Sequence, residues 1–397
     1  MTRFKKTPIG EIPEDWEVVE LGDLLDLKNG KRPIFSEKGS IPVYGANGIM
    51  GYTDTPLVKK GKVLIIGRVG ASGEVHLAEG PVWISDNAMY SSKIESKLVD
   101  IEYLGALLKY INLQKLATKN VHPLITKKIL MPFKIPLPPL PEQRKIAEIL
   151  RTVDEAIEKT DLAIERTERL KKGLMGRLLT RGIKHERFKK TKLGEIPEEW
   201  KVVRIKDTGR VLTGKTPPTS EDRYWNGEIP FITPADIGDT PYVYTTNRYV
   251  TTEGIEKAGK LLPKDTVLVV CIGSTIGKVA LTYQESITNQ QINAIMCKDS
   301  VNPHYLYYAL LFHSKRLKSW AGTAAVPIIK KSLFEKFKIP LPSLSEQKQI
   351  SEILLTVDKK LELLRKRREK LERIKRGLMK DLLTGRRRVH VTTEKHK

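Results

Sequence analysis

Two long segments of the chain place apolar residues at alternating steps of four and three, the spacing of a coiled-coil seam. The first seam consists of Ile146, Leu150, Val153, Ile157, Ile164, Leu174 and Leu178. The second seam keeps the same register at Ile350, Leu354, Val357, Leu361, Leu364, Leu371, Leu378 and Leu382. We therefore predict two helices of about 40 residues, each about 60 Å long at 1.5 Å per residue.

Polar residues interrupt both seams. Thr160, Thr167 and Lys171 interrupt the first, and Arg368 and Lys375 interrupt the second, with Lys171 and Lys375 at equivalent positions. A helix of this length cannot bury its own apolar stripe, so we expect the two helices to pack on each other. The alternative is two separate helices, each lying on its own globular domain.

Glycines mark the ends of both helices and also lie inside them. Gly182 and Gly385 stand where a helix C-terminus is expected. Gly173 and Gly377 lie inside the helical segments, where each costs about 1 kcal/mol relative to Ala. Because they occupy matched positions, we expect a packing reason such as close approach of the two helices.

The chain is an internal duplication. The segment Phe133–Gln143, which precedes the first helix, returns almost unchanged as Phe337–Gln347. Near the other end of each repeat, Gly10–Trp16 returns as Gly194–Trp200. We divide the chain into globular regions at 1–140 and 185–344, long helices at 141–184 and 345–388, and a tail at 389–397.

Each globular region combines strands and helices. Continuous apolar runs at Val63–Ile66 and Val267–Val270 predict buried strands that lead into glycine-containing turns. Helical segments are expected around Tyr103–Leu116 and Tyr305–Trp320. The predicted fold class is α+β: two globular domains with mixed or antiparallel sheets, separated by two long antiparallel helices that form a coiled coil, in a pseudo-two-fold tandem repeat.

The two globular regions differ in their loops. The segments Glu37–Thr55 and Pro218–Lys260 do not match, although the strands and helices around them do. Two copies of one scaffold therefore present different surfaces.

Charge narrows the class of ligand. The formal net charge is +23 and the isoelectric point is about 9.7, which favours nucleic acid or another anionic partner over an ordinary basic protein. No apolar run approaches the length of a membrane span, and the N-terminus lacks the apolar core of a signal peptide. The two cysteines are too few for a disulfide framework, so we expect a cytoplasmic protein.

The duplicated globular regions, the long helices and the two repeated motifs resemble the specificity (S) subunit of type I restriction-modification systems. This resemblance implies a non-catalytic subunit whose two target recognition domains each read one half of a bipartite, asymmetric site in double-stranded DNA. It also implies that the helices fix the half-site spacing and dock methyltransferase (M) subunits, two in number, with restriction (R) subunits joining the full complex. S-adenosylmethionine, ATP and Mg²⁺ would then bind to those partners, and this chain would carry no cofactor.

Two other classes stay open at this point. One is a stand-alone enzyme that modifies or cleaves DNA, and the other is a structural coiled-coil scaffold that reads no sequence. Gly273–Lys278 resembles a phosphate loop, but it is one residue short and is followed by Val279. Asn302–Tyr305 is similar to an adenine methyltransferase motif that His304 interrupts. The seven histidines show no metal-binding or catalytic-triad spacing.

Candidate DNA contacts are cationic and amide side chains on loops, because Lys and Arg bind phosphate while Arg, Asn, Gln and Thr bind base edges. In the first domain we select Lys31, Arg32, Asn47, Arg68, Asn87 and Lys119. In the second we select Lys215, Thr216, Arg223, Tyr224, Asn226, Lys278, Asn289 and Gln290. The alternative for each is an ordinary solvated side chain.

Overall fold

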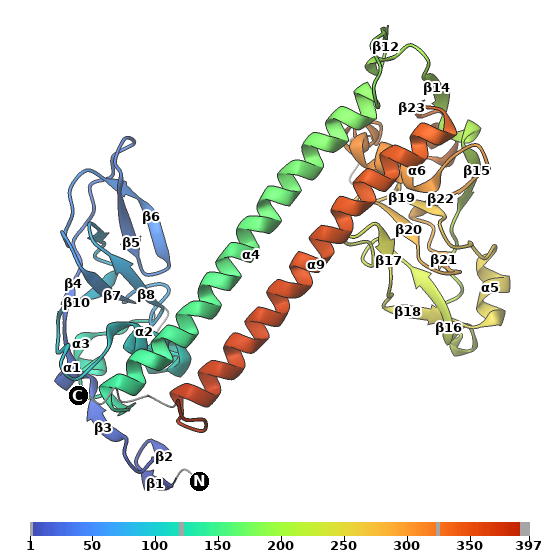
Figure 1. Ribbon diagram of the computed structural model, residues 1–397. Helices are drawn as coiled ribbons and strands as arrows, with labels where there is room; N and C mark the ends of the chain where they lie inside the picture. Colours follow the sequence, from blue (N-terminus) through green and yellow to red (C-terminus); the bar gives the residue numbers. More distant parts are fainter. Residues whose placement is uncertain (1–2, 119–122, 323–325, 390–397) are drawn as a thin grey trace, which may run out of the picture. The chain divides into compact units, whose positions relative to one another are not determined.

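The computed structural model describes residues 3–118, 123–322 and 326–389, which form two compact units (Figure 1). The first unit contains residues 1–160 and 367–397, and the second contains residues 161–366. Each unit holds one globular domain together with the start of one long helix and the end of the other. Of the predicted tail, residues 390–397 lie outside the described residues.

The first domain is built from a four-stranded sheet, a three-stranded sheet, two two-stranded sheets and short helices. An antiparallel sheet has the order β4-β10-β7-β8, with bounds Leu25–Asn29, Ala88–Ile94, Lys62–Gly67 and Val75–Glu79. A second sheet has the order β6-β5-β9, with bounds Gly48–Thr53, Ile41–Gly45 and Trp83–Ile84. The remaining elements are β1 (Phe4–Thr7), β2 (Gly10–Pro13), β3 (Glu17–Glu20), β11 (Lys134–Leu137), α1 (Leu21–Leu24), α2 (Ile101–Ile111), η1 (Leu113–Leu116) and α3 (Lys127–Leu130).

The second domain repeats this plan with a larger sheet. Its five-stranded sheet has the order β15-β22-β19-β20-β17, with bounds Gly209–Thr213, Ile292–Cys297, Val267–Val270, Val279–Thr282 and Tyr242–Val243. A three-stranded sheet has the order β18-β16-β21, with bounds Arg248–Val250, Trp225–Ile232 and Ile287–Thr288. The remaining elements are β12 (Phe188–Thr191), β13 (Gly194–Pro197), β14 (Lys201–Arg204), β23 (Lys338–Leu341), η2 (Ile205–Asp207), η3 (Asp222–Tyr224), α5 (Thr252–Ala258), α6 (Pro303–Phe312), α7 (Ser314–Lys318) and α8 (Lys331–Phe334).

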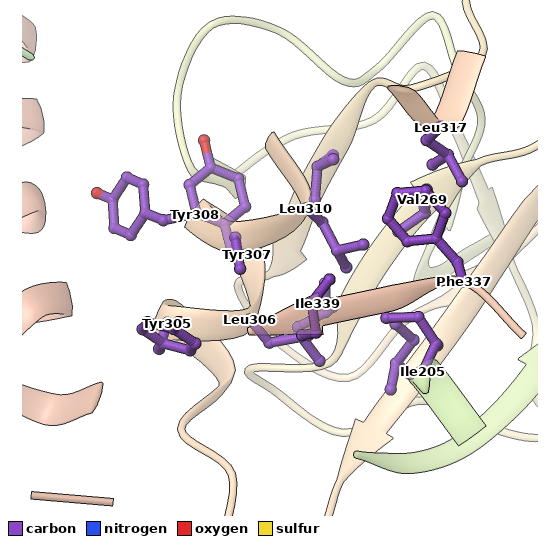
Figure 2. Close-up of a cluster of buried hydrophobic side chains, with 14 of the residues drawn as sticks. Ile205, Val269, Tyr305, Leu306, Tyr307, Tyr308, Leu310, Leu317, Phe337 and Ile339 are labelled. Carbon is purple, nitrogen blue, oxygen red and sulfur yellow. The ribbon is translucent and has the colours of Figure 1, made fainter. Parts of the chain in front are cut away.

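The continuous apolar strands explain how each domain is layered. In β19, Val267 and Val269 face a core that includes α6, whereas Leu268 and Val270 face a second core on the opposite side. Figure 2 shows the first of these cores, where Val269 lies among side chains from α6, Phe337 and Ile339. Because successive side chains of a strand point to opposite faces, a strand with apolar layers on both sides reads as an unbroken apolar run.

The repeated Glu-Gln pair fixes the start of each long helix. Gln143 in α4 (Leu140–Arg181) donates from Nε2 to the carbonyl oxygens of Leu98, at 2.9 Å, and Pro138, at 2.8 Å. Its Oε1 accepts from the backbone N–H of Asp100 at 2.9 Å. Gln347 in α9 (Leu344–Leu383) makes the equivalent three bonds. These buried amides tie each long helix to the domain that precedes it.

The glutamate of each pair forms a junction with a tryptophan and with the end of the other helix. In the second unit, the carboxylate of Glu346 accepts from Trp200 Nε1 at 3.0 Å and from the backbone N–H of Ile183 at 2.9 Å. In the first unit, Glu142 accepts from Trp16 Nε1 at 3.1 Å and from Arg388 Nε at 2.8 Å. We call each of these a Glu–Trp junction.

The long helices run antiparallel within each unit. In the first unit, Asp154 of α4 pairs with Lys375 of α9 at 2.5 Å, and in the second unit Lys171 of α4 pairs with Asp358 of α9 at 2.6 Å. Residue numbers fall along α9 as they rise along α4, which defines the antiparallel direction. All predicted seam residues are buried or half-buried. The predicted α+β fold class with tandem repeats and long antiparallel helices is confirmed.

The polar interruptions of the seams have local partners. The hydroxyl groups of Thr160 and Thr167 are buried and donate to the carbonyl oxygens of Ala156 and Ala163, each at 2.7 Å. A threonine that bonds the preceding helical turn satisfies its hydroxyl without leaving the helix. Polar residues are therefore accommodated in the first seam without a break in α4.

The two seam lysines occupy equivalent positions but different surroundings. The Lys171–Asp358 pair is mostly shielded, with side chains 16% and 7% exposed, and the hydroxyl of Tyr308 donates to the same aspartate at 2.5 Å. The Lys375–Asp154 pair is 31% and 52% exposed. Burial, followed by the nearby charge of Asp358, raises the pKa of Tyr308, so its hydroxyl stays protonated and acts as a donor.

Our expectation for the glycines inside the helices is wrong. A methyl group added at Gly173 or Gly377 would have no heavy atom within 4 Å, and both glycines are exposed. Close helix packing therefore does not explain them. The glycines at the helix ends behave as expected, because Gly182 and Gly385 have φ angles of +63° and +69°.

We predict that Asp358→Ala destabilises the second unit by about 3 kcal/mol or more, because it leaves the ammonium of Lys171 without its partner in a shielded site. The equivalent substitution Asp154→Ala should cost about 1 kcal/mol or less, since that pair is open to solvent. Urea unfolding of the two variants would measure this difference. Equal losses of stability would contradict the prediction.

Candidate nucleic-acid interface

Four loops converge at one end of the sheets in the first domain. The N–H groups of Gly30 and Lys31 donate to carbonyl oxygens of Ala88 and Ile84, both at 2.9 Å, which holds the Gly30–Lys31 turn beside the β9–β10 connection. The N–H of Arg68 donates to the carbonyl oxygen of Asn87 at 2.8 Å. These bonds bring Lys31, Arg68 and Asn87 together from separate parts of the chain.

The β5–β6 turn joins the same group. A Cβ on Gly67 would fall 3.0 Å from the carbonyl oxygen of Ala46, so the turn that carries Asn47 lies directly against the end of β7. Asn47 is exposed, as are Lys31, Arg32 and Asn87, while Arg68 is half-buried. Lys119 lies outside the described residues.

Apolar side chains are exposed beside these loops. Ile34, Ile49, Met50 and Tyr52 are 80%, 53%, 49% and 50% exposed. Their loops are bound together, since the N–H of Ser36 donates to the carbonyl oxygen of Tyr52 at 2.9 Å. The loop cluster of the first domain therefore combines amide, cationic and apolar groups.

The second domain forms the corresponding loop cluster. The N–H of Lys215 donates to the carbonyl oxygen of Thr288 at 3.0 Å, and the N–H of Asn289 donates to the carbonyl oxygen of Ile232 at 3.1 Å. The hydroxyl of Thr216 donates to Gln290 Oε1 at 2.6 Å. Lys215 and Gln290 are exposed, whereas Asn289 is buried and donates from Nδ2 to Gln291 Oε1 at 2.8 Å.

Three of the selected side chains in the second domain have internal partners. Tyr224 is only 2% exposed and packs in a core with Val250, so its ring has almost no surface to offer to DNA. Arg223 donates to Glu221 from Nε, at 2.9 Å, and from a terminal nitrogen, at 2.5 Å. Lys278 donates to the carbonyl oxygen of Ile237 at 2.8 Å.

A polar hollow lies within Pro218–Lys260, the segment of the second domain that does not match the first, which we call the insertion. It has a cavity volume of about 380 Å³ and includes the exposed Asn226, which has a φ angle of +60°. Trp225, Asn247 and Arg248 also line it. The sequence pattern pointed to Asn226 but not to the other three residues, because they come together only when β16 pairs with β18.

The enzyme-like patterns have structural roles. Within Gly273–Lys278, the amine of Lys278 donates to the carbonyl oxygens of Ile237, at 2.8 Å, and Pro234, at 3.3 Å. Asn302 caps α6, since its side-chain oxygen accepts from the N–H of Tyr305 at 2.9 Å, and Pro303 occupies the first turn. His304 lies 2.6 Å from the hydroxyl of Tyr242, and burial lowers its pKa.

Within residues 3–118, 123–322 and 326–389, no three or more His, Cys, Asp or Glu side chains form a group suited to a metal ion. Over the same ranges, no helix combines the length and apolar character needed to cross a lipid bilayer.

The fold and its loops define a tandem-repeat protein with one recognition domain in each repeat. The chain belongs to the family described as "Type I restriction modification DNA specificity domain", which matches residues 13–166 and 197–373. The two matched segments correspond to the two halves of the duplication.

Individual relatives agree with this family. The chain is 30% identical to the type I restriction enzyme MjaVIII specificity subunit of Methanocaldococcus jannaschii, over 97% of this chain and 96% of that protein. Its fold is similar to that of the S subunit of a type I restriction-modification system from M. genitalium, with a TM-score of 0.69 and 18% identity, covering 95% of this chain and 97% of that one. A chain from a structural study of complex assembly and conformational transition of the type I R-M system gives a TM-score of 0.55 at 19% identity, covering 94% and 99%.

We predict that replacing Lys31, Arg32 and Lys215 together with Ala flattens the dependence of log K on log salt for duplex DNA. Each lost phosphate contact should reduce the slope by about 0.9. Filter binding or fluorescence anisotropy over a salt series would measure it. The matched control replaces Lys6, Lys190 and Lys192, which are exposed on the β1–β2 and β12–β13 hairpins. A slope unchanged in the first triple variant would remove its residues from the interface.

Proposed function

We propose that this chain is the DNA sequence-recognition subunit of a type I restriction-modification complex, with no catalytic role of its own. Each domain reads one half of a bipartite, asymmetric site in double-stranded DNA. One observation carries this proposal: the same frame is built twice, with matched loop clusters that carry different side chains. A duplicated frame suits the antiparallel strands of a duplex, and unlike loops make the two half-sites unlike.

The long helices have two roles in this proposal. The 42 residues of α4 correspond to about 60 Å at 1.5 Å per residue, an upper bound on how far one helix can separate two half-sites. Their centres are expected about one duplex turn apart, about 34–36 Å. The outer faces of the helix pair would dock two methyltransferase subunits, with restriction subunits joining the larger complex.

The chemistry would belong to those partners. S-adenosylmethionine for methylation, and ATP and Mg²⁺ for cleavage, would bind the partner subunits and leave this chain without a cofactor. A cytoplasmic location is part of the proposal, since DNA and the partner subunits are found there. Cys271 and Cys297 are both free thiols in the described structure, which suits a reducing compartment.

The direct test is selection from a randomised duplex library by the chain, with and without a methyltransferase subunit. We expect enrichment of two unlike blocks of bases separated by a spacer of fixed length. A scaffold that reads no sequence would enrich nothing, and that outcome would overturn the proposal. Incubating the purified chain alone with DNA, Mg²⁺, ATP and S-adenosylmethionine tests the stand-alone enzyme, for which modified or cleaved DNA would be the positive result.

Lengthening both helices tests their role as a ruler. Adding one heptad to α4 after Thr160 and one to α9 after Lys366 preserves both seams and extends each helix by about 10 Å. At 3.4 Å per base pair, we expect the selected spacer to grow by about three base pairs while both half-sites stay the same. A changed base preference in either half-site would contradict the ruler.

A further inference from the structure

The insertion in the second domain contains a buried tryptophan whose ring is held in place by its neighbours. Trp225 is 6% exposed and packs edge-on against Phe231, with ring centroids 5.1 Å apart and planes at 89°. Its indole N–H donates to the carbonyl oxygen of Pro218 at 3.0 Å, which fixes the ring in its plane. One face of this indole supports an arginine.

The guanidinium group of Arg248 lies over that face. The central carbon of its guanidinium group is 3.4 Å from the centroid of the Trp225 ring, and the arginine is exposed. Strand pairing places it there, since Phe231 of β16 is the register partner of Arg248 in β18. A cation over a tryptophan ring is held there by the charge distribution of the ring, and its N–H groups can still donate to a ligand.

The guanidinium of Arg248 is also uncommitted. Among the described residues, no carboxylate forms an ion pair or side-chain hydrogen bond with it. Arg223 provides the contrast within the same insertion, because it stacks on Tyr224 at 4.9 Å but its charge is engaged by Glu221. Both arginines therefore rest on aromatic rings, but only the guanidinium group of Arg248 is available to bind a ligand.

Amide groups line the hollow beside Arg248. Asn247 is oriented by Asp236, whose Oδ1 accepts from the backbone N–H at 2.9 Å and from Nδ2 at 2.8 Å. The other oxygen of Asp236 accepts from the N–H and hydroxyl of Thr233 at 2.8 and 2.7 Å. Because Thr233 directly follows β16, these bonds attach the hollow to the loop cluster that holds Lys215 and Gln290.

We propose that Arg248 is a specificity-determining residue that reads a guanine in the half-site of the second domain. This inference rests on the proposed function. The planar fork of an arginine matches the O6 and N7 acceptors of guanine in the major groove. Phosphate is the competing ligand for an arginine, but the sugar-phosphate backbone is the same in both half-sites. A contact with it gives no reason for the guanidinium group to lie in a polar hollow of the insertion, the segment that does not match the first domain.

Arg248→Lys is the informative substitution, because it keeps the charge and removes the planar fork. The experiment is the duplex selection described above, performed with the full chain and its methyltransferase subunit. The wild-type protein should enrich guanine at one position of one half-site. The variant should lose about 5- to 150-fold of that preference, the range for a bidentate arginine–guanine pair, and should keep the other half-site unchanged.

Arg187→Lys, at an exposed arginine just before β12 that is not among the candidate DNA contacts, is the matched control and should leave every position of both half-sites as in the wild type. Thermal unfolding of both variants would show that the fold is retained. Arg248→Gln is a second substitution at the same position, and it removes the charge as well as the planar fork. If Arg248→Lys and Arg248→Gln bind all duplexes more weakly by one factor with an unchanged base preference, Arg248 contacts phosphate and the inference fails. A wild-type half-site without guanine would also overturn it. A wild-type protein that enriches no sequence would overturn the proposed function itself.

Discussion

The carboxylate of the repeated glutamate is the interaction on which each unit depends. In the second unit, Glu346 lies in the first turn of α9, yet its hydrogen bonds go to Trp200 of the domain and to residues just beyond α4. His185 approaches Glu346 Oε1 at 2.8 Å, and Gly182 turns the chain where a Cβ would meet that same oxygen at 2.4 Å. One half-buried acid thus joins the start of one helix, the end of the other and the first strands of a domain.

In the first unit, an arginine takes the corresponding place beside the glutamate. Arg388 binds Glu142 and also donates to Asp15 at 2.7 and 2.6 Å. Hydrogen bonding to Arg388 lowers the pKa of Asp15, and its bonds to Glu142 and Asp15 raise the pKa of Arg388. This part of the anchor is therefore present above the unfolded pKa of Asp15 and is lost as the pH falls through its lower folded value.

Much of this architecture could be predicted from the sequence, because two independent signals agree. The seam spacing and the repeated motifs both place the long helices, and the observed bounds of α4 differ from the predicted ones by three residues or fewer. The glycines inside the helices misled us, since a matched position suggests a shared contact while Gly173 and Gly377 in fact face open space. Propensity rules describe the cost of such a residue but contain nothing about its neighbours.

The candidate interface was harder to predict because exposure depends on pairing between distant strands. Tyr224 and Arg223 are adjacent in sequence, but the ring is buried in a core and the guanidinium is bound by Glu221. Arg248 gave no sequence signal, since its aromatic support belongs to another strand whose register with β18 is irregular. The net charge of the sequence could point to a class of ligand. It could not distinguish an arginine that is paired with a carboxylate from one that is available to bind a ligand.

The repeated residues anchor the long helices, whereas the residues of the insertion form the candidate contacts with DNA. Every partner of Glu346 and Gln347 lies in the frame, so substitutions in the insertion leave the anchors of the helix intact. Conversely, the stacking of Arg248 on Trp225 depends on the packing of β16 and β18, and within the described part of the second unit no hydrogen bond joins these strands to its Glu–Trp junction. Stability and recognition are thereby placed on different atoms of one domain. A frame of this kind can carry a new loop, and with it a new half-site, without changing the helices that hold the two domains together.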